Sequence, residues 1–180
     1  VLEAHDISFG YTSDNLLFRH INLAINARDR FAVIGNNGKG KSTLLNLLSG
    51  GLKPVTGEIK AHPDMKLGYF GQTNIQRLNP KLTIEQEIEH TNPALTRTQV
   101  RNICGTMMFS GDLALKKVSV LSGGEKSRTL LGKILAHPSN LLLLDEPNNH
   151  LDMESIDALI ESLQEFPGAL LIVTHNERIL

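Results

Sequence analysis

The chain lacks three features that would each point to a particular class of protein. It contains one cysteine, Cys104, so no disulfide framework or thiolate metal site is predicted, and a reducing, cytoplasmic compartment fits. Lys and Arg number 18 against 19 Asp and Glu, which gives a net charge of −1 and no basic patch for a nucleic acid. The longest apolar runs, 141–144 and 169–173, are far shorter than the roughly 20 residues of a membrane span.

What the chain does contain is typical of one globular domain. It has 180 residues, of which 41% are hydrophobic and 21% charged, so it is long enough to bury a core. It begins at Val1 without a methionine, already within a strand-like stretch. We therefore expect 1–180 to be one module of a longer polypeptide.

The most informative segment is GNNGKGKST, which matches G-x-x-x-x-G-K-[ST]. It lies between a short apolar strand at 30–34 and a helix-favouring run at 44–48. Backbone N–H groups of such a loop wrap phosphates, Lys41 reaches the outer ones, and Ser42 holds Mg²⁺. A helix beginning at Lys41 adds its positive dipole end at the same place. We therefore predict a nucleoside triphosphate with magnesium as the ligand, against the alternative of a glycine-rich turn that binds nothing. The predicted phosphate-binding residues are Gly35, Asn36, Asn37, Gly38, Lys39, Gly40, Lys41, Ser42 and Thr43.

The remaining pattern predicts an α/β fold. Strands are expected at 2–9, 21–25, 57–60, 66–70, 141–144 and 169–174, and helices at 123–136 and 153–166. Two capping boxes, Thr83 with Gln86 and Thr96 with Gln99, predict further helix starts. Strands that are apolar throughout indicate a parallel sheet covered by helices on both faces.

Four of the apolar segments end in residues suited to phosphate chemistry. They lead into the phosphate loop, Gln72, Asp145-Glu146 and His175. Ligands of parallel sheets lie outside the carboxyl ends of the strands, so one site is predicted at this rim.

Each of these polar residues has a predicted role and a structural alternative. Asp145 is expected to bind Mg²⁺ through water, and Glu146 to orient the attacking water and accept its proton. Gln72 and His175 can position water and the γ-phosphate. The alternatives are an exposed acidic pair, a surface glutamine and a strand-capping histidine.

A second anion site is predicted at the start of the helix at 123–136. Ser122 is a good N-cap, and Gly123 and Gly124 leave backbone N–H groups open to close approach. One nucleotide cannot obviously satisfy two such helix ends. The hypothesis is that this end receives a phosphate held by another copy of the module, and the alternative is an ordinary capped helix.

These motifs, in this order, resemble those of ATP-binding cassette (ABC) ATPases over essentially the whole chain. The resemblance implies a P-loop NTPase fold with a mainly parallel core sheet flanked by helices, an N-terminal antiparallel β subdomain and a small helical subdomain at about 74–120. It implies Mg²⁺ ligation by Ser42, Gln72 and Asp145, catalysis involving Glu146, His175, Gln72 and Lys41, and a D-loop ending at Asp152. The signature is Leu121 to Glu125, and Tyr11 matches the aromatic residue on which adenine stacks, although a turn aromatic is equally compatible.

Within the ABC ATPases, the chain is most similar to the ABC-F subfamily, whose members carry two cassettes on one chain and associate with ribosomes. The supporting segments are GYFGQ at 68–72, SGGEKSR at 122–128 and DEPNNHLD at 145–152. The interval from Gln72 to Leu121 is too short for a long coiled-coil insertion. The resemblance implies a second cassette as partner, and a ribosome or RNA contacted through regions outside this fragment.

Three residues depart from the family pattern. Lys39 replaces a small residue, Asn148 a threonine, and Asn176 an aspartate. Lys39 is expected to face water, and the two asparagines affect the expected rate of hydrolysis more than binding. If these departures weaken catalysis, the chain would be a clamp that binds nucleotide but scarcely hydrolyses it. A separate alternative is a transporter ATPase that docks on a membrane protein through 74–117.

Overall fold

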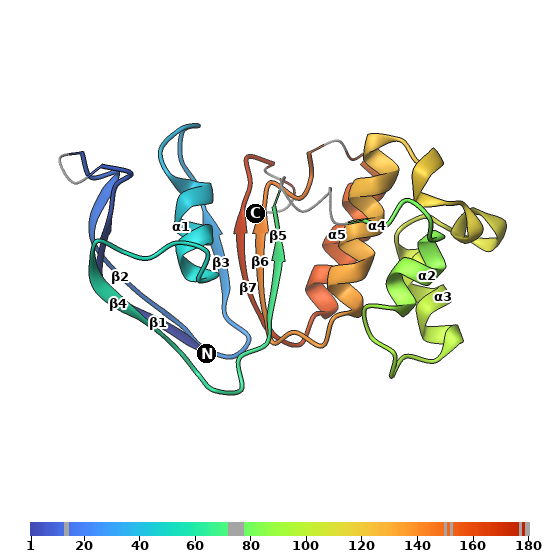
Figure 1. Ribbon diagram of the computed structural model, residues 1–180, viewed down its shortest axis with the longest axis horizontal. Coiled ribbons are helices and arrows are strands. Elements are labelled where there is room, and N and C mark those ends of the chain that lie inside the picture. Colours follow the sequence, from blue (N-terminus) through green and yellow to red (C-terminus); the bar gives the residue numbers. More distant parts are fainter. Residues whose placement is uncertain (13–14, 72–77, 150, 152, 177, 179–180) are drawn as a thin grey trace.

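The computed structural model describes residues 1–12, 15–71, 78–149, 151, 153–176 and 178. Its central sheet contains β3 (Arg30–Val33), β5 (Leu67–Phe70), β6 (Leu141–Asp145) and β7 (Ala169–Val173) in the order β3-β7-β6-β5. All three strand pairings are parallel. The predicted parallel core sheet is confirmed, and its carboxyl ends share one edge (Figure 1).

A second sheet is antiparallel and comes from the N-terminal third of the chain. Strand β1 (Leu2–Phe9) lies between β2 (Phe18–Ile25) and β4 (Thr56–Ala61). Strand β2 begins at Phe18 rather than at the predicted Ile21, because Phe18 pairs with Phe9 across the sheet. Residues 18–20, which precede the predicted start, are Phe-Arg-His and carry no alternating apolar pattern that could have predicted this pairing.

Helices cover both faces of the parallel sheet. Helix α1 (Lys41–Leu48) lies between the two sheets, and α4 (Gly123–Ala136) and α5 (Met153–Glu165) lie on the other face (Figure 1). Alternate residues of β6 enter two different cores: Leu141 and Leu143 pack with the α1 side, Leu142 and Leu144 with the α4 and α5 side. This alternation explains why β7, and β6 up to Leu144, are apolar at every position.

The helical part lies beyond α4 and α5, at the end of the molecule away from the antiparallel sheet (Figure 1). It contains α2 (Ile84–Glu89), α3 (Arg97–Thr106) and the short 3₁₀ helices η2 (Gly111–Leu115) and η3 (Val118–Val120). Both predicted capping boxes are present, at Thr83 and Thr96. Within the described ranges, no helix has the length and apolar character needed to cross a bilayer.

The run Met107, Met108 and Phe109 divides between core and surface: Met107 and Phe109 are buried, but Met108 is 39% exposed. Helix α3 ends here, and Met108 takes a left-handed backbone conformation with φ of 64°. The N–H of Phe109 then donates to the C=O of Cys104 at 2.8 Å, which closes the helix end. This reversal directs the middle side chain away from the core.

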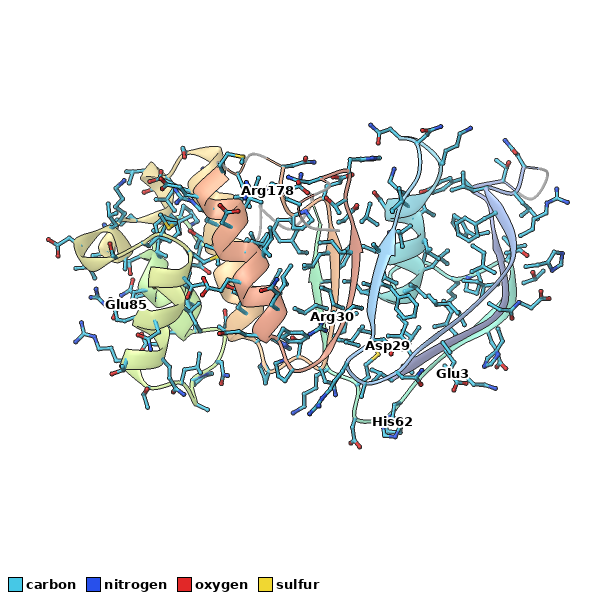
Figure 2. The ribbon with its side chains drawn as sticks, turned by 180° about the vertical axis from the view of Figure 1, so that it is seen from behind. Glu3, Asp29, Arg30, His62, Glu85 and Arg178 are labelled. Carbon is cyan, nitrogen blue, oxygen red and sulfur yellow. The ribbon has the colours of Figure 1, made fainter. Side chains whose placement is uncertain are left out.

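Arg30 helps to fix the register of β3 against β7 at the edge of the sheet where these strands begin. The Arg30 guanidinium donates to the backbone C=O groups of Gly168 and Phe166, just before β7. Figure 2 labels Arg30 at this lower edge, while Glu85 lies on the helical side, Glu3 on the antiparallel sheet and His62 just beyond the end of β4. Arg30 and Leu170 are register partners, so β3 and β7 reach the opposite edge together.

Candidate functional site

A pocket of about 870 Å³ opens at the carboxyl edge of the parallel sheet. It collects residues from β6, the loops after β3, β6 and β7, the start of α1, and the N-terminal sheet region. The structure therefore brings together most of the residues predicted for the site. The lining residues are Tyr11, Leu17, Asn37, Gly38, Gly40, Lys41, Ser42, Thr43, Asp145, Glu146, Asn148, Asn149, Val173, His175 and Asn176.

The phosphate loop has the backbone that its glycines predict. Gly38 and Gly40 have φ of 75° and 91°, a region that other residues rarely adopt. A side chain at Gly40 would also approach the Leu17 side chain to 2.6 Å. Helix α1 starts at Lys41, as expected, and its positive end faces the pocket.

Lys41 is held across this loop. Its Nζ donates to the C=O groups of Gly35 and Asn36, at 2.7 and 3.0 Å. The lysine therefore lies over the cradle in which a phosphate chain would be gripped. Lys39 is exposed and does not line the pocket, in agreement with the expectation that it faces water.

The arrangement around Asp145 fits a hard cation. Asp145 is 7% exposed, and its Oδ1 is buried without a hydrogen-bond donor among the described residues. Ser42 lines the same pocket. A buried carboxylate oxygen is costly unless something binds it, and Mg²⁺ prefers oxygen ligands of this kind. Gln72, the third predicted ligand, lies outside the described residues.

Tyr69, at the end of β5, was missed by sequence reasoning. With Ser42 and Asp145 it lines a smaller adjoining hollow of about 290 Å³. Burial, and secondarily the negative charge of Asp145, raises the pKa of the Tyr69 phenol. The sequence feature that could have identified Tyr69 is its place in GYFGQ, three residues before Gln72. Leu17 was also missed, and no local pattern marks it.

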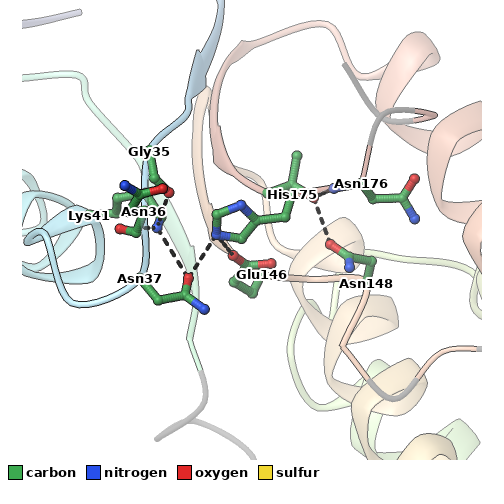
Figure 3. Close-up of polar contacts among 9 residues, drawn as sticks. Gly35, Asn36, Asn37, Lys41, Glu146, Asn148, His175 and Asn176 are labelled. Atoms are coloured by element: carbon green, nitrogen blue, oxygen red, sulfur yellow. Dashed lines mark hydrogen bonds and ion pairs between the residues drawn. The ribbon is translucent and has the colours of Figure 1, made fainter.

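His175 and Glu146 lie in direct contact (Figure 3). The His175 Nε2 is 2.9 Å from Asn37 Oδ1 and 3.3 Å from Glu146 Oε1. Lys41 Nζ also donates a hydrogen bond to Asn37 Oδ1, at 3.5 Å. Because both imidazole partners are oxygen acceptors, Nε2 carries the hydrogen. A carboxylate, an imidazole and an ammonium group therefore converge on one side of the pocket.

Tyr11 lies beside the phosphate loop and is 74% exposed. Its hydroxyl is 2.9 Å from Thr43 Oγ1. Its ring packs on the ring of Phe9 in an edge-to-face arrangement, with 5.2 Å between the centroids. An exposed aromatic face next to the pocket is compatible with base stacking, which stays a prediction.

The N-terminal end of α4 has the predicted N-cap, but it lies outside the pocket. Ser122 Oγ accepts the Glu125 N–H at 3.2 Å, and Glu125 Oε2 accepts the Ser122 N–H at 2.8 Å. Gly123 has open space where a side chain would project. Ser122, Gly123 and Gly124 do not line the pocket, and α4 lies across the sheet from α1 (Figure 1). The two helix ends therefore do not meet within this chain.

The charge on Glu125 should make this helix start sensitive to acid. The Ser122 N–H, and then the Lys116 ammonium at 3.0 Å, hold the pKa of the Glu125 carboxyl below its ordinary value. A lowered pKa stabilises the fold above the ordinary value of 4.5 and loses that contribution as the pH falls through the folded pKa. We expect Glu125→Gln, which can keep the capping box, to lower the free energy of unfolding by about 0.5 kcal/mol at neutral pH.

Urea unfolding across pH would measure this difference. It should shrink as the pH falls below 4.5 and vanish once the pH lies below the lowered pKa of Glu125, where wild type is protonated as well. Glu161→Gln, on the exposed side of α5, is the control and should show no difference at either pH. A Glu125→Gln effect that stayed constant with pH would contradict the role of the charge.

A family model described as ABC transporter matches residues 18–149. The chain belongs to the ABC transporter family. The predicted enzyme class, an ATPase of the ABC type, is confirmed at the level of this family. The match includes the phosphate loop, the signature and Asp145-Glu146.

Relatives of known name point to the F subfamily within the ABC family. The chain is 37% identical over its whole length to ATP-binding cassette sub-family F member 3 of Mus musculus, covering 25% of that protein. It is 39% identical over its whole length to the probable ATP-binding protein YheS of Escherichia coli O6:H1, covering 28%. The chain thus spans about a quarter of the length of the relatives it matches.

Solved ABC cassettes share the fold. The dimeric structure of the bacterial ABC transporter cassette MJ0796 aligns with a TM-score of 0.82 at 22% identity, over 99% of this chain and 90% of that one. The same cassette, in a dimeric post-hydrolysis state bound to ADP and Pi, aligns with a TM-score of 0.78 at 21% identity, over the same shares. The predicted P-loop NTPase fold is confirmed.

Proposed function

We propose that this cassette binds Mg-ATP and hydrolyses it to ADP and phosphate. The observation that carries the proposal is the convergence of the phosphate loop, the unpartnered Asp145 oxygen and the Glu146–His175 contact on one pocket. The bound triphosphate would lie against the loop's N–H groups with Lys41 at its outer phosphates. Family membership supports the reaction.

The chain's own groups suffice for the proton transfer. Glu146 is 18% exposed, so its carboxylate reaches the pocket but is largely shielded from bulk water. It would orient a water against the γ-phosphate and accept its proton. His175, with its hydrogen on Nε2, would hold the Glu146 carboxylate so that the water is in line with the γ-phosphate, and Gln72 is proposed to assist there. Mg²⁺, held by Ser42 and Asp145 with Gln72 as proposed third ligand, would supply charge neutralisation of the phosphates.

Phosphate release in the presence of Mg-ATP tests hydrolysis directly. The wild type should exceed the Lys41→Ala variant by at least about tenfold. A wild type no faster than this variant would leave only the nucleotide-binding clamp.

We further propose that the working unit is a pair of cassettes, with the signature of one closing on the nucleotide of the other. Support comes from the separation of Ser122, Gly123 and Gly124 from the pocket, and from the dimeric state of the similar cassette. In the full protein the second cassette is proposed to lie on the same chain. Similarity to F-subfamily relatives supports a cytoplasmic, ribosome-associated role exerted through regions outside these residues.

Sedimentation velocity tests the pairing. Glu146→Gln at tens of micromolar should sediment as a dimer with Mg-ATP and as a monomer without it. Adding Gly123→Arg, which fills the open approach to the signature helix, should abolish the dimer while leaving ATP binding intact. A strict monomer in ATP would contradict the paired unit.

A further inference from the structure

Near the His175–Glu146 contact, two loops are joined by a partly buried hydrogen bond. The Thr174 hydroxyl donates to Asn148 Oδ1 at 2.8 Å, across 26 residues of sequence (Figure 3). Thr174 is completely buried, and its Oγ1 also accepts the N–H of Asn176 at 3.1 Å. We refer to the pair Asn148 and Thr174 as the brace.

The brace connects the two residues proposed to handle the attacking water. Asn148 is two residues after Glu146, in the loop that follows β6. Thr174 directly precedes His175, in the loop that follows β7. Besides the His175–Glu146 contact itself, the described residues show one further hydrogen bond between these segments: the Glu146 N–H donates to the Val173 C=O at 2.8 Å. The bond from Asn148 to Thr174 therefore adds a further tie that restricts the separation of the two loops.

Glu146 needs such support because its backbone is strained. Its φ of 49° lies in the left-handed region, which residues with a side chain seldom occupy. The Asn149 N–H, donating to the Glu146 C=O at 3.1 Å, closes the turn that holds it. Strain of this kind persists only where surrounding contacts over-determine the conformation. Asn148 lies inside this turn and ties it to the loop that follows β7.

The two asparagines that depart from the family pattern are not equivalent. Asn176 bonds to the Thr174 hydroxyl through its backbone N–H, which any residue except proline supplies. Its Oδ1 accepts the N–H of Arg178 at 2.9 Å. Asn148 takes part through its carboxamide oxygen, which lies one bond farther from the backbone than a threonine hydroxyl. Removing that oxygen leaves the buried Thr174 hydroxyl without its acceptor.

We propose that Asn148 is a positioning residue for hydrolysis: through Thr174 it keeps His175 against the Glu146 carboxylate. This inference rests on the proposed ATPase activity. Asn148 acts on the orientation of the water-handling pair rather than on the grip on phosphates. Its loss should therefore lower kcat and leave the KM for Mg-ATP unchanged.

A double-mutant cycle on hydrolysis tests the brace. Asn148→Ala and Thr174→Val should each lower kcat about tenfold, with KM within about twofold of wild type. The double variant should be no slower than either single variant, because each removes the same bond. The matched control is Thr129→Val, since Thr129 is equally buried and its hydroxyl makes an equally short 2.8 Å bond, to the Glu125 C=O in α4. It should keep the wild-type kcat.

A second readout needs no turnover. The His175 ring resonances of the nucleotide-free protein, identified with His175→Gln, should shift in both brace variants and stay in place in Thr129→Val. Additive losses of kcat, a rise in KM alone, or unshifted His175 resonances in an active protein would overturn the brace. A wild type that does not exceed Lys41→Ala would overturn the proposed hydrolysis, and the positioning role with it.

Discussion

Replacing Glu146 by glutamine should slow phosphate release by about 10²- to 10⁴-fold, the usual contribution of a general base. Glutamine has the same shape but cannot accept a proton at neutral pH. Its amide oxygen can still accept from His175 Nε2, which lies 3.3 Å from Oε1 in the wild type. The change therefore removes the proton acceptor and leaves the surrounding geometry in place.

Single-turnover phosphate release with Mg-ATP measures this effect. The variant should still bind nucleotide, so Mg-ATP should stabilise it by nearly as much as it stabilises the wild type. Glu161→Gln makes the same chemical change on the exposed side of α5 and should hydrolyse at the wild-type rate. A Glu146→Gln rate within a few-fold of wild type would mean that another group takes the proton.

The sequence predicted those parts of the fold that are encoded locally. The capping boxes at Thr83 and Thr96 and the start of α1 at Lys41 depend on residues within one helical turn, and all three occur as expected. The continuous apolar run of β6 depends only on burial on both faces, and it too was correct. The position of β2 was less accurate, because the Phe9–Phe18 pairing depends on a partner strand.

The site shows the same division between local and long-range information. That four strand ends meet at one rim follows from parallel pairing and needs no side-chain detail. That Asn37 contacts His175, 138 residues away, depends on the register of β3 against β7 and could not be predicted. The left-handed backbone of Glu146 was equally invisible, since no glycine or asparagine marks that position. The role of Asn148 emerged only when Thr174 was placed beside it.

Replacing Lys41 by alanine should remove most of the affinity for Mg-ATP. In the wild type, ligand at about a hundred times Kd should add roughly 2.7 kcal/mol of stability. For a domain of this size that corresponds to a rise in Tm of about 5–11 °C. The Lys41 ammonium is the cation that the structure places over the phosphate loop, through its bonds to the Gly35 and Asn36 carbonyls. Without it, the outer phosphates lose their charge-assisted partner, and the rise in Tm should nearly disappear.

The neighbouring lysine provides the control that separates a specific contact from general charge. Lys39→Ala removes the same charge from the same loop, but Lys39 is exposed, does not line the pocket, and leaves the loop's backbone N–H groups unchanged. Its rise in Tm with Mg-ATP should be close to that of wild type. Equal losses in both variants would mean that the loop attracts nucleotide by net charge alone. A full rise in Lys41→Ala would place the phosphates elsewhere, because no other described ammonium group lines this pocket.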